Sequence, residues 1–266
     1  MKRVKIARFD PILKKALWGT ESWEISAFLS NPSIFSCGFD AGASLSDVIP
    51  GFPLLFKVID AKDRLSVQVH PCEASAPIVG GDPKTEMWYL LEDGLIFAGL
   101  KPGVGAADVE KAVRDGSFED VLVRHEAKKG ECFFIPGGLV HAIAEGTRVY
   151  EVQQSSDTTY RLYDWNRVDA AGKSRELHLE KGLKAIDYTL PVPRPAKDVT
   201  CPFFTFRPVG LDGERTVAVD GFLALFNDGG TLVADGVEIP EQTSALAYGK
   251  GDVTLRGSAR VLTTVV

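Results

Sequence analysis

Several features that would assign the chain to a common functional class are missing from its 266 residues. No apolar stretch approaches the roughly 20 residues that a membrane helix needs, so we expect no membrane partner. Lysine and arginine form no long run and the net charge is -6, which argues against a nucleic-acid partner. The basic start, residues 1–8, is not followed by an apolar segment, so we expect no signal peptide.

Cysteine and histidine are scarce, with four of each. The cysteines stand far apart without a C-x-x-C pair, which favours free thiols in a reducing cytoplasm over a disulfide framework. They are Cys37, Cys72, Cys132 and Cys201. Histidine ends at His178, so we expect no second histidine-dependent site in the C-terminal part.

Short apolar runs separated by glycine and proline predict a mainly β protein with a few helices. The predicted strands are 54–60, 64–70, 86–91, 95–100, 132–135, 148–154 and 160–165. Apolar residues recur at helical spacing in the two predicted helices, 106–114 and 176–186.

Three prolines within 190–195 predict a stiff, extended linker. Beyond it, short strands alternate with predicted turns at 227–230 and 234–236. We therefore divide the chain into a larger part, 1–192, and a smaller β domain, 193–266.

The predicted strand 64–70 alternates polar and β-branched side chains. Ser66, Gln68 and His70 share one face, whereas Val67 and Val69 share the other. Three polar groups that point the same way suit a barrel with a polar interior, and two of them can bind a metal ion. Taken alone, the segment fits an amphipathic edge strand with a solvated face better.

Two further segments supply a carboxylate and an imidazole. Lys84 and Glu86 stand two residues apart, and Glu86 enters an apolar strand where a carboxylate needs a partner or a metal. A surface Lys–Glu pair is the simpler explanation for that segment alone. A Pro-Gly-Gly turn at 136–138 precedes His141 and would direct it back into a barrel. Together with strand 64–70, these groups offer two nitrogen and two oxygen ligands, as in catalytic zinc sites.

The segment 151–165 has a dense polar centre that includes Glu151, Asp157 and Arg161. The arginine would suit the binding of a phosphate or of a developing oxyanion. A surface loop with turn-capping polar groups is the alternative, and this segment alone favours it.

Four motifs stand out when the segments are considered together. They are Ser66-x-Gln68-x-His70-Pro71, Lys84-x-Glu86, Pro136-x-x-x-x-His141-Ala142 and Gln154-x-Ser156-Asp157-x-x-Tyr160-Arg161-x-Tyr163-Asp164. They resemble the type I mannose-6-phosphate isomerases of the cupin superfamily, most closely the short bacterial form. The likeness is specific, because Gln-x-His replaces the His-x-His of most cupins. It implies a cupin-type β-barrel (jelly roll) in 1–192 and a smaller, ligand-free, cupin-like domain in 193–266.

The resemblance also implies an activity, the interconversion of mannose 6-phosphate and fructose 6-phosphate with one zinc ion per chain. The implied zinc ligands are Gln68, His70, Glu86 and His141. The implied catalytic residues are Lys84, Glu151 and Arg161, and the implied substrate-binding residues are Ser66, Lys84 and Arg161. The general base stays open among Lys84, Glu151 and Asp157. Departures from the family pattern at 80–83 and at Met87 affect the shape of the pocket rather than its functional groups.

Other functions are compatible with the same residues. An isomerase of a related sugar phosphate or of a free aldose would keep the metal site and differ in loops. A non-catalytic, sugar-binding cupin would have lost a ligand or the arginine, and both are present here. We expect His125 and His178 to be structural or solvated, a small-molecule sugar phosphate as partner, a cytoplasmic location, and a monomer or weak homodimer.

Overall fold

The structure is a computed structural model that describes residues 4–168 and 171–266, so the first three residues of the basic start lie outside it. Contacts divide the chain into two compact units. The terminal unit comprises Met1–Leu13, Ser22–Lys57 and Ala196–Val266, and the histidine unit comprises Lys14–Glu21 and Val58–Pro195. None of the helices in the described ranges is long and apolar enough to cross a membrane.

The unit boundary at Pro195 lies close to the predicted division at residue 192, and residues 190–195 form neither helix nor strand. The two divisions differ in the N-terminal stretch. Most of its residues belong to the same unit as the C-terminal strands, and β1 (Lys5–Phe9) pairs antiparallel with β19 (Ser244–Val265). A division that cuts the sequence at one point cannot place an N-terminal strand in the same unit as the C-terminal strands.

The terminal unit is built on one sheet with the order β16-β17-β19-β1-β6, and β18 pairs with β17. Its remaining strands and helix are β4 (Ala27–Phe28), β5 (Asn31–Pro32), β6 (Phe35–Gly38), α1 (Leu45–Val48), β16 (Val199–Thr200), β17 (Thr205–Ala234) and β18 (Val237–Glu238). The 30-residue β17 curves around β19, so that Phe206 and Ala224 both lie opposite Thr264. An apolar core fills the space inside this curve.

One of the two turns predicted in the terminal unit is wrong. Residues 227–230 stay within β17, where Asn227 pairs with Val261 and Gly229 with Arg260, so Asp228 forms a bulge. The Asn227 side chain stabilises the bulge by donating to the carbonyls of Gly230 and Ile239. The other turn is confirmed, with positive φ angles of 43° at Asp235 and 85° at Gly236.

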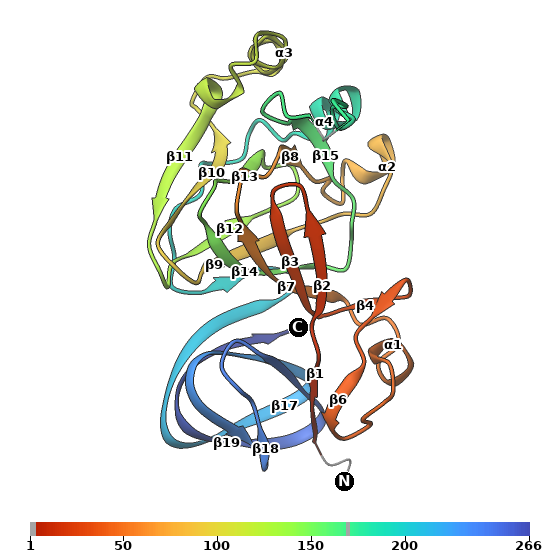
Figure 1. Ribbon diagram of the computed structural model, residues 1–266, viewed down its shortest axis with the longest axis vertical. Coiled ribbons are helices and arrows are strands. Elements are labelled where there is room, and N and C mark those ends of the chain that lie inside the picture. Colours follow the sequence, from red (N-terminus) through yellow and green to blue (C-terminus); the bar gives the residue numbers. More distant parts are fainter. Residues whose placement is uncertain (1–3, 169–170) are drawn as a thin grey trace. The chain divides into compact units, whose positions relative to one another are not determined.

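The histidine unit is a barrel made of two facing sheets, as Figure 1 shows. One sheet has the order β11-β10-β13-β8-β15 and the other β12-β9-β14-β7-β3-β2. The strands are β2 (Ile12–Ala16), β3 (Gly19–Ile25), β7 (Leu54–Ala61), β8 (Val67–Val69), β9 (Glu86–Leu90), β10 (Gly94–Leu100), β11 (Leu122–Ala127), β12 (Cys132–Ile135), β13 (His141–Ile143), β14 (Arg148–Gln154) and β15 (Tyr160–Tyr163). The division between the units passes through β2, β3 and β7.

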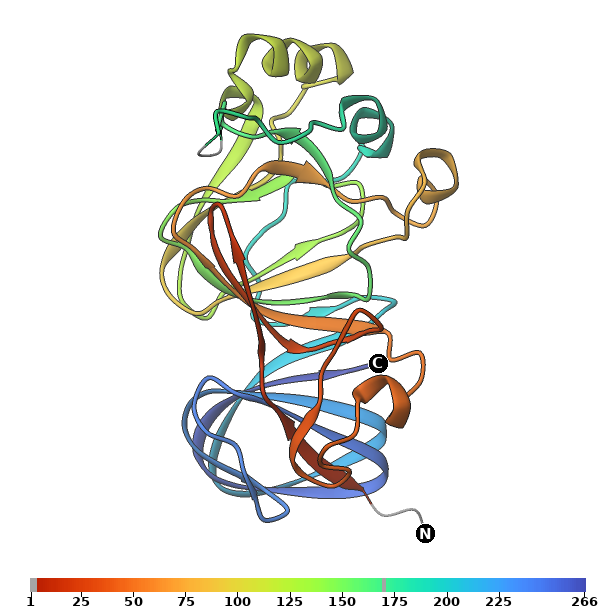
Figure 2. The ribbon, with the colours of Figure 1, turned by 45° about the vertical axis from the view of Figure 1, so that its right-hand side comes forward.

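Helices cover the outer face of the five-stranded sheet (Figure 2). They are α2 (Ala76–Val79), α3 (Ala106–Asp115), the short 3₁₀-helix Phe118–Val121 and α4 (Leu179–Ala185). Val67 and Val69 pack into the core between this sheet and the helices. A second core lies between the two sheets and includes Trp88, Phe133 and Ile143. The predicted alternation of strand 64–70 is therefore confirmed on its apolar side.

The regular elements predicted for this unit are present with small differences in length. Strands 132–135 and 148–154 have the predicted bounds. The strand predicted over 64–70 is confined to Val67–Val69, and Pro71, which has no N–H, prevents it from continuing. The helix predicted over 176–186 spans only Leu179–Ala185, and just before it the His178 N–H donates to the Arg161 carbonyl.

Candidate metal centre

Both sheets of the barrel contribute polar side chains to one buried position. Gln68 lies on β8 directly opposite His141, the first residue of β13. His70 follows β8 by one residue. Glu86 opens β9 on the facing sheet, on the same side of the strand as Trp88, which packs in the core between the sheets. The predicted ligands, scattered over more than 70 residues of sequence, are thus brought together by the barrel.

Three of these side chains converge closely. The Nε2 atoms of His70 and His141 are 3.2 Å apart. Glu86 Oε2 lies 3.4 Å from His70 Nε2, and Glu86 Oε1 lies 3.5 Å from His141 Nε2. Each of the three residues is at most 1% exposed, and their potential ligand atoms all lie within 4.8 Å of one another.

The carboxylate of Glu86 is the feature that fits a cation. Within residues 4–168 and 171–266, neither of its buried oxygens accepts a hydrogen bond of normal geometry. Lys84 Nζ lies 2.8 Å from Oε2 as an ion-pair partner. Burial alone would raise the pKa of Glu86, but the positive charge of Lys84, together with the contacts to the neighbouring histidines, outweighs burial and holds that pKa well below its usual range. An ionised, poorly satisfied carboxylate facing two imidazole nitrogens fits a divalent metal.

Both histidines are held in the tautomer that a metal requires. His70 Nδ1 is 2.8 Å from the Thr158 carbonyl, and His141 Nδ1 is 2.8 Å from the Leu139 carbonyl. Because a carbonyl only accepts hydrogen bonds, each Nδ1 carries the proton and each Nε2 presents a lone pair to the centre. Burial, reinforced by Lys84, lowers the pKa of His70 to about 4, and burial also lowers the pKa of His141. Neutral imidazole is the ligating form.

Gln68 lies beside this group of three. Its Nε2 is 3.3 Å from His141 Nε2, and its Oε1 is 3.4 Å from the Ser66 hydroxyl. Rotation about the last side-chain torsion exchanges the two ends of an amide, so the oxygen can face the centre without a change in backbone. Ser66 is buried and borders the centre through Gln68.

The Pro-Gly-Gly turn positions the two histidines relative to each other. The Gly138 N–H donates to the His70 carbonyl at 2.8 Å, and Gly138 has a φ of +93°, which favours glycine. A Cβ on Gly137 would lie 2.7 Å from the Pro71 carbonyl oxygen. The turn therefore depends on glycine at both positions to pack against the end of the His70 strand.

The predicted catalytic residues lie at different distances from the centre. Lys84 reaches it directly, with Nζ 3.1 Å from His70 Nε2. Glu151 points to the barrel interior from β14 and accepts a hydrogen bond from Trp88 Nε1 at 2.9 Å. The Trp88 ring in turn meets His141 edge-on, with centroids 5.4 Å apart. Asp157 is exposed on the loop after β14.

Arg161 is placed by its strand. It lies on β15 directly opposite Gln68, so both side chains are on the same face of the sheet. Its Nη1 donates to the Glu176 carbonyl at 2.8 Å, while its buried Nε makes no hydrogen bond to another described residue. Partial burial, with Arg175 adding to it, lowers the pKa of Arg161, but an arginine remains charged.

The contacts of two histidines were only partly anticipated. His178 Nδ1 accepts a hydrogen bond from the Arg161 N–H at 3.1 Å, and the His178 N–H donates to the Arg161 carbonyl at 2.7 Å. This reciprocal pair fixes the backbone of Arg161, so His178 is structural in a way that supports the site. His125 lies on β11 with Nε2 3.1 Å from the Ala98 carbonyl. The partners of His70 and His141 are backbone carbonyls, which every residue has, so the sequence gives no signal by which to predict them.

The departure at Met87 does not touch the centre. Neighbouring residues of a strand point to opposite faces, so Met87 faces away from the side chain of Glu86. Gly81, in the other departure, has a φ of +71°, and a Cβ at this position would lie 2.5 Å from Thr158 Cγ2. A side chain at that position would meet Thr158, so this glycine keeps two loops of the site close together.

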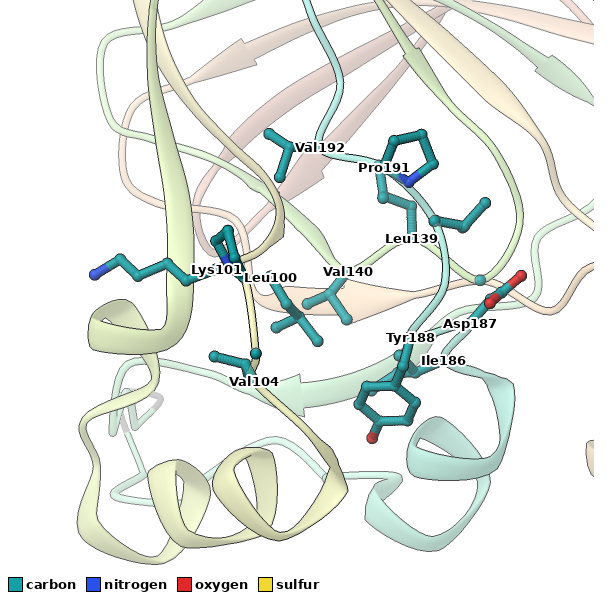
Figure 3. Close-up of a pocket in the computed structure, with 14 residues that line it drawn as sticks. Leu100, Lys101, Val104, Leu139, Val140, Ile186, Asp187, Tyr188, Pro191 and Val192 are labelled. Carbon is teal, nitrogen blue, oxygen red and sulfur yellow. The ribbon is translucent and has the colours of Figure 1, made fainter.

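A separate cavity of about 240 Å³ lies beside the segment that leads into His141 (Figure 3). Its lining is largely apolar and includes Leu100, Val104, Leu139, Val140, Ile186 and Tyr188. None of the predicted site residues lines it. The cavity is therefore separate from the predicted metal-binding and catalytic residues.

Comparisons with known proteins agree with this geometry. The catalytic-domain model of type I phosphomannose isomerase matches residues 40–88, which include Gln68, His70, Lys84 and Glu86. The mannose-6-phosphate isomerase ManA of Bacillus subtilis is 36% identical over 212 residues, which cover 67% of each chain. The crystal structure of the mannose 6-phosphate isomerase from Bacillus subtilis superposes with a TM-score of 0.87 at 25% identity, covering 99% of this chain and 100% of that one. A mannose 6-phosphate isomerase solved with zinc and yttrium shares the fold, with a TM-score of 0.72 at 15% identity and coverage of 98% of each chain. The chain belongs to the type I phosphomannose isomerase family.

Proposed function

We propose that the protein interconverts mannose 6-phosphate and fructose 6-phosphate, and that zinc bound by Gln68, His70, Glu86 and His141 is its cofactor. The observation that carries the proposal is the buried Glu86 carboxylate, which lacks normal hydrogen bonds and faces the Nε2 atoms of two neutral histidines. The names of the relatives support the substrate, and the neighbour solved with zinc supports the metal.

The donor set suits the reaction. A zinc ion in such a mixed nitrogen and oxygen site supplies Lewis acidity toward an oxygen of the open-chain sugar. The isomerisation also needs a proton moved between C1 and C2, which is the work of a general base on the protein. It further needs donors for the anionic oxygens that develop on the sugar.

Arg161 is the proposed donor to anionic oxygens. Its guanidinium stays protonated and offers a planar fork of N–H groups, and its strand places it opposite Gln68. The buried Nε without a hydrogen-bond partner in the described chain leaves a donor available for substrate. Ser66 and Lys84 are the other proposed contacts for the sugar phosphate.

The general base is proposed among Lys84 and Glu151. Lys84 Nζ is within 3.1 Å of a predicted ligand atom, so a base there would reach a sugar held at the centre. Glu151 is buried and oriented by the Trp88 indole, which fixes a carboxylate as a base requires. Asp157 is exposed on its loop, which argues against it.

The location and organisation are proposed on separate grounds. None of the four cysteines forms a disulfide within the described residues, which supports a reducing compartment and hence the cytoplasm. All four histidines lie in the histidine unit, which supports catalysis there and no second metal site in the terminal unit. A monomer or weak homodimer remains our prediction for the assembly.

The test is turnover of mannose 6-phosphate to fructose 6-phosphate before and after removal of metal with a chelator. We expect activity to vanish with the metal, to return on addition of zinc and to be absent in His141→Ala. Glucose 6-phosphate and free mannose, assayed in parallel, distinguish a related sugar as the true substrate. A folded, zinc-loaded protein without turnover of mannose 6-phosphate would refute the assignment and leave the metal site standing.

A further inference from the structure

The segment 154–158, which runs from the last residue of β14 into the loop before β15, contacts the metal centre through its backbone. The carbonyl of Thr158 accepts the hydrogen bond of His70 Nδ1 at 2.8 Å. Within the described residues, this is the one hydrogen bond of that nitrogen. This carbonyl accepts the proton of Nδ1, while Lys84 Nζ, which can only donate, lies 3.1 Å from Nε2, so the two groups together keep the proton of His70 on Nδ1.

Ser156 fixes the position of that carbonyl. Its hydroxyl donates to the Asp82 carbonyl at 3.0 Å and accepts from the Thr158 N–H at 3.2 Å. The Asp82 N–H in turn donates to Thr158 Oγ1 at 3.0 Å. Three hydrogen bonds thus close a network among Ser156, Thr158 and Asp82, and Ser156 is only 2% exposed.

The same loop is tied to the strand that carries Glu86. Gln154 Oε1 accepts from the Thr85 N–H at 2.7 Å, and the Gln154 N–H donates to the Thr85 carbonyl at 3.0 Å. The buried Gln153, which lies opposite Glu86 on β14, donates from Nε2 to the Ser156 carbonyl at 2.7 Å. The loop therefore connects the histidine that follows β8 to the glutamate that opens β9 on the other sheet.

We propose that Ser156 is a positioning residue of the metal centre, which holds the Thr158 carbonyl and so keeps His70 in the tautomer that presents Nε2 to zinc. The inference rests on the proposed zinc site and adds a residue that contacts neither the metal nor the sugar. Its neighbour Ser155, only partly buried, makes no side-chain hydrogen bond within the described chain. It offers a matched control one residue away.

The test measures zinc affinity and the histidine tautomer separately. Metal-free wild type, Ser156→Ala and Ser155→Ala are titrated with zinc against a competing chelator. Loss of an outer contact to a ligating histidine typically weakens metal binding about 10–100-fold. We expect that loss in Ser156→Ala and less than about a twofold change in Ser155→Ala. Because the chain has four histidines, nitrogen NMR of the metal-free protein can assign each ring, and we expect the fraction of His70 in the Nδ1–H form to fall in Ser156→Ala and to stay at the wild-type level in Ser155→Ala.

A second pair of variants serves if Ser156→Ala does not fold. Thr158→Val keeps the shape of the side chain but removes the acceptor for the Asp82 N–H, whereas Thr158→Ser keeps the acceptor. We expect weaker zinc binding in the first and affinity near that of wild type in the second. Unchanged affinity and tautomer in both Ser156→Ala and Thr158→Val would overturn the proposal. If wild type itself bound no zinc, the proposed function would fail, and the tautomer of His70 would still decide whether Ser156 positions that ring.

Discussion

At the scale of single residues, the protonation of the groups that form the centre is set by their hydrogen-bond partners, by burial and by a neighbouring charge. His70 and His141 each use one nitrogen for a backbone carbonyl, which frees the other for the centre. Burial keeps both rings neutral near pH 7. The cost of an ionised carboxylate beside them is offset by Lys84, which lies at ion-pair distance.

Arg161 provides the first prediction. Arg161→Lys keeps the charge but loses the planar fork, so we expect kcat to fall about 10²-fold while zinc content is unchanged. Steady-state kinetics with metal analysis of the same samples measures both. The exposed Arg124 gives the control Arg124→Lys, for which we expect wild-type kinetics. Full activity in Arg161→Lys would show that the fork is not used in the reaction.

Asp40 in the terminal unit provides a prediction for pH. Its carboxylate accepts from Lys5 Nζ at 2.8 Å and from the Tyr248 hydroxyl at 2.7 Å, and these bonds lower the pKa of Asp40. A lowered pKa stabilises the fold above the unfolded value of about 3.9, and this stabilisation is lost as the pH falls through the lower folded value. Asp40→Asn is therefore expected to lower the unfolding midpoint at pH 6 and to have a smaller effect at an acidic pH below the folded pKa of Asp40, where this carboxyl is protonated in the folded protein as well. Equal destabilisation at both pH values, measured by thermal unfolding, would exclude this linkage.

The residues that sequence reasoning could find are those with a side-chain signal. Alternation in strand 64–70 predicts that Ser66, Gln68 and His70 share a face, and the opposite face does pack into the helix-side core. The carbonyls of Thr158 and Leu139 could not be found this way, because every residue has a carbonyl and only the fold selects one. The resemblance to a family, rather than periodicity, singled out the partners from the facing sheet.

At the scale of elements, turns and strand ends decide where the side chains meet. Strands 132–135 and 148–154 were predicted with the correct bounds because apolar runs and glycines mark their ends. The turn predicted at 227–230 failed because its pattern, Asn-Asp-Gly-Gly, also suits a bulge held by an asparagine side chain. Local composition predicts that regular strand pairing is interrupted at these residues, but it does not predict whether the chain also reverses direction there.

The Pro-Gly-Gly turn provides a prediction at this scale. In Gly137→Ala the new methyl would lie 2.7 Å from the Pro71 oxygen and 2.8 Å from Cys72 Cα, both of them backbone atoms. Overpacking of this kind typically costs about 1–3 kcal/mol, and here it would also shift the end of the His70 strand. We expect a lower unfolding midpoint and weaker zinc binding. Gly210 has open space around its Cβ position, so Gly210→Ala is the control and should leave both quantities nearly unchanged.

At the scale of the whole molecule, the chain builds two units from interleaved segments. The terminal unit takes its N-terminal strand β1 from residues that precede the barrel, and pairs it with β19 from the end of the chain. Sequence patterns report neighbours along the chain, so they led to a single division at residue 192 and gave no sign that β1 pairs with β19. All four histidines lie in the histidine unit, and the sequence has none after residue 178.

This division predicts where zinc acts on stability. A ligand that binds only the folded state stabilises it by about 4 kcal/mol at a thousand times its Kd, and local openings that break the site are suppressed. We expect zinc to slow amide hydrogen exchange in β8, β9 and β13, whose residues form the centre, and to leave β17 and β19 unchanged. Mass spectrometry of peptides from the zinc-loaded and metal-free protein measures both regions in one experiment. The His141→Ala variant, treated identically, controls for zinc bound elsewhere. Equal protection of β17 and β19 would mean that the two units open together, and a unit-by-unit account of stability would then be wrong.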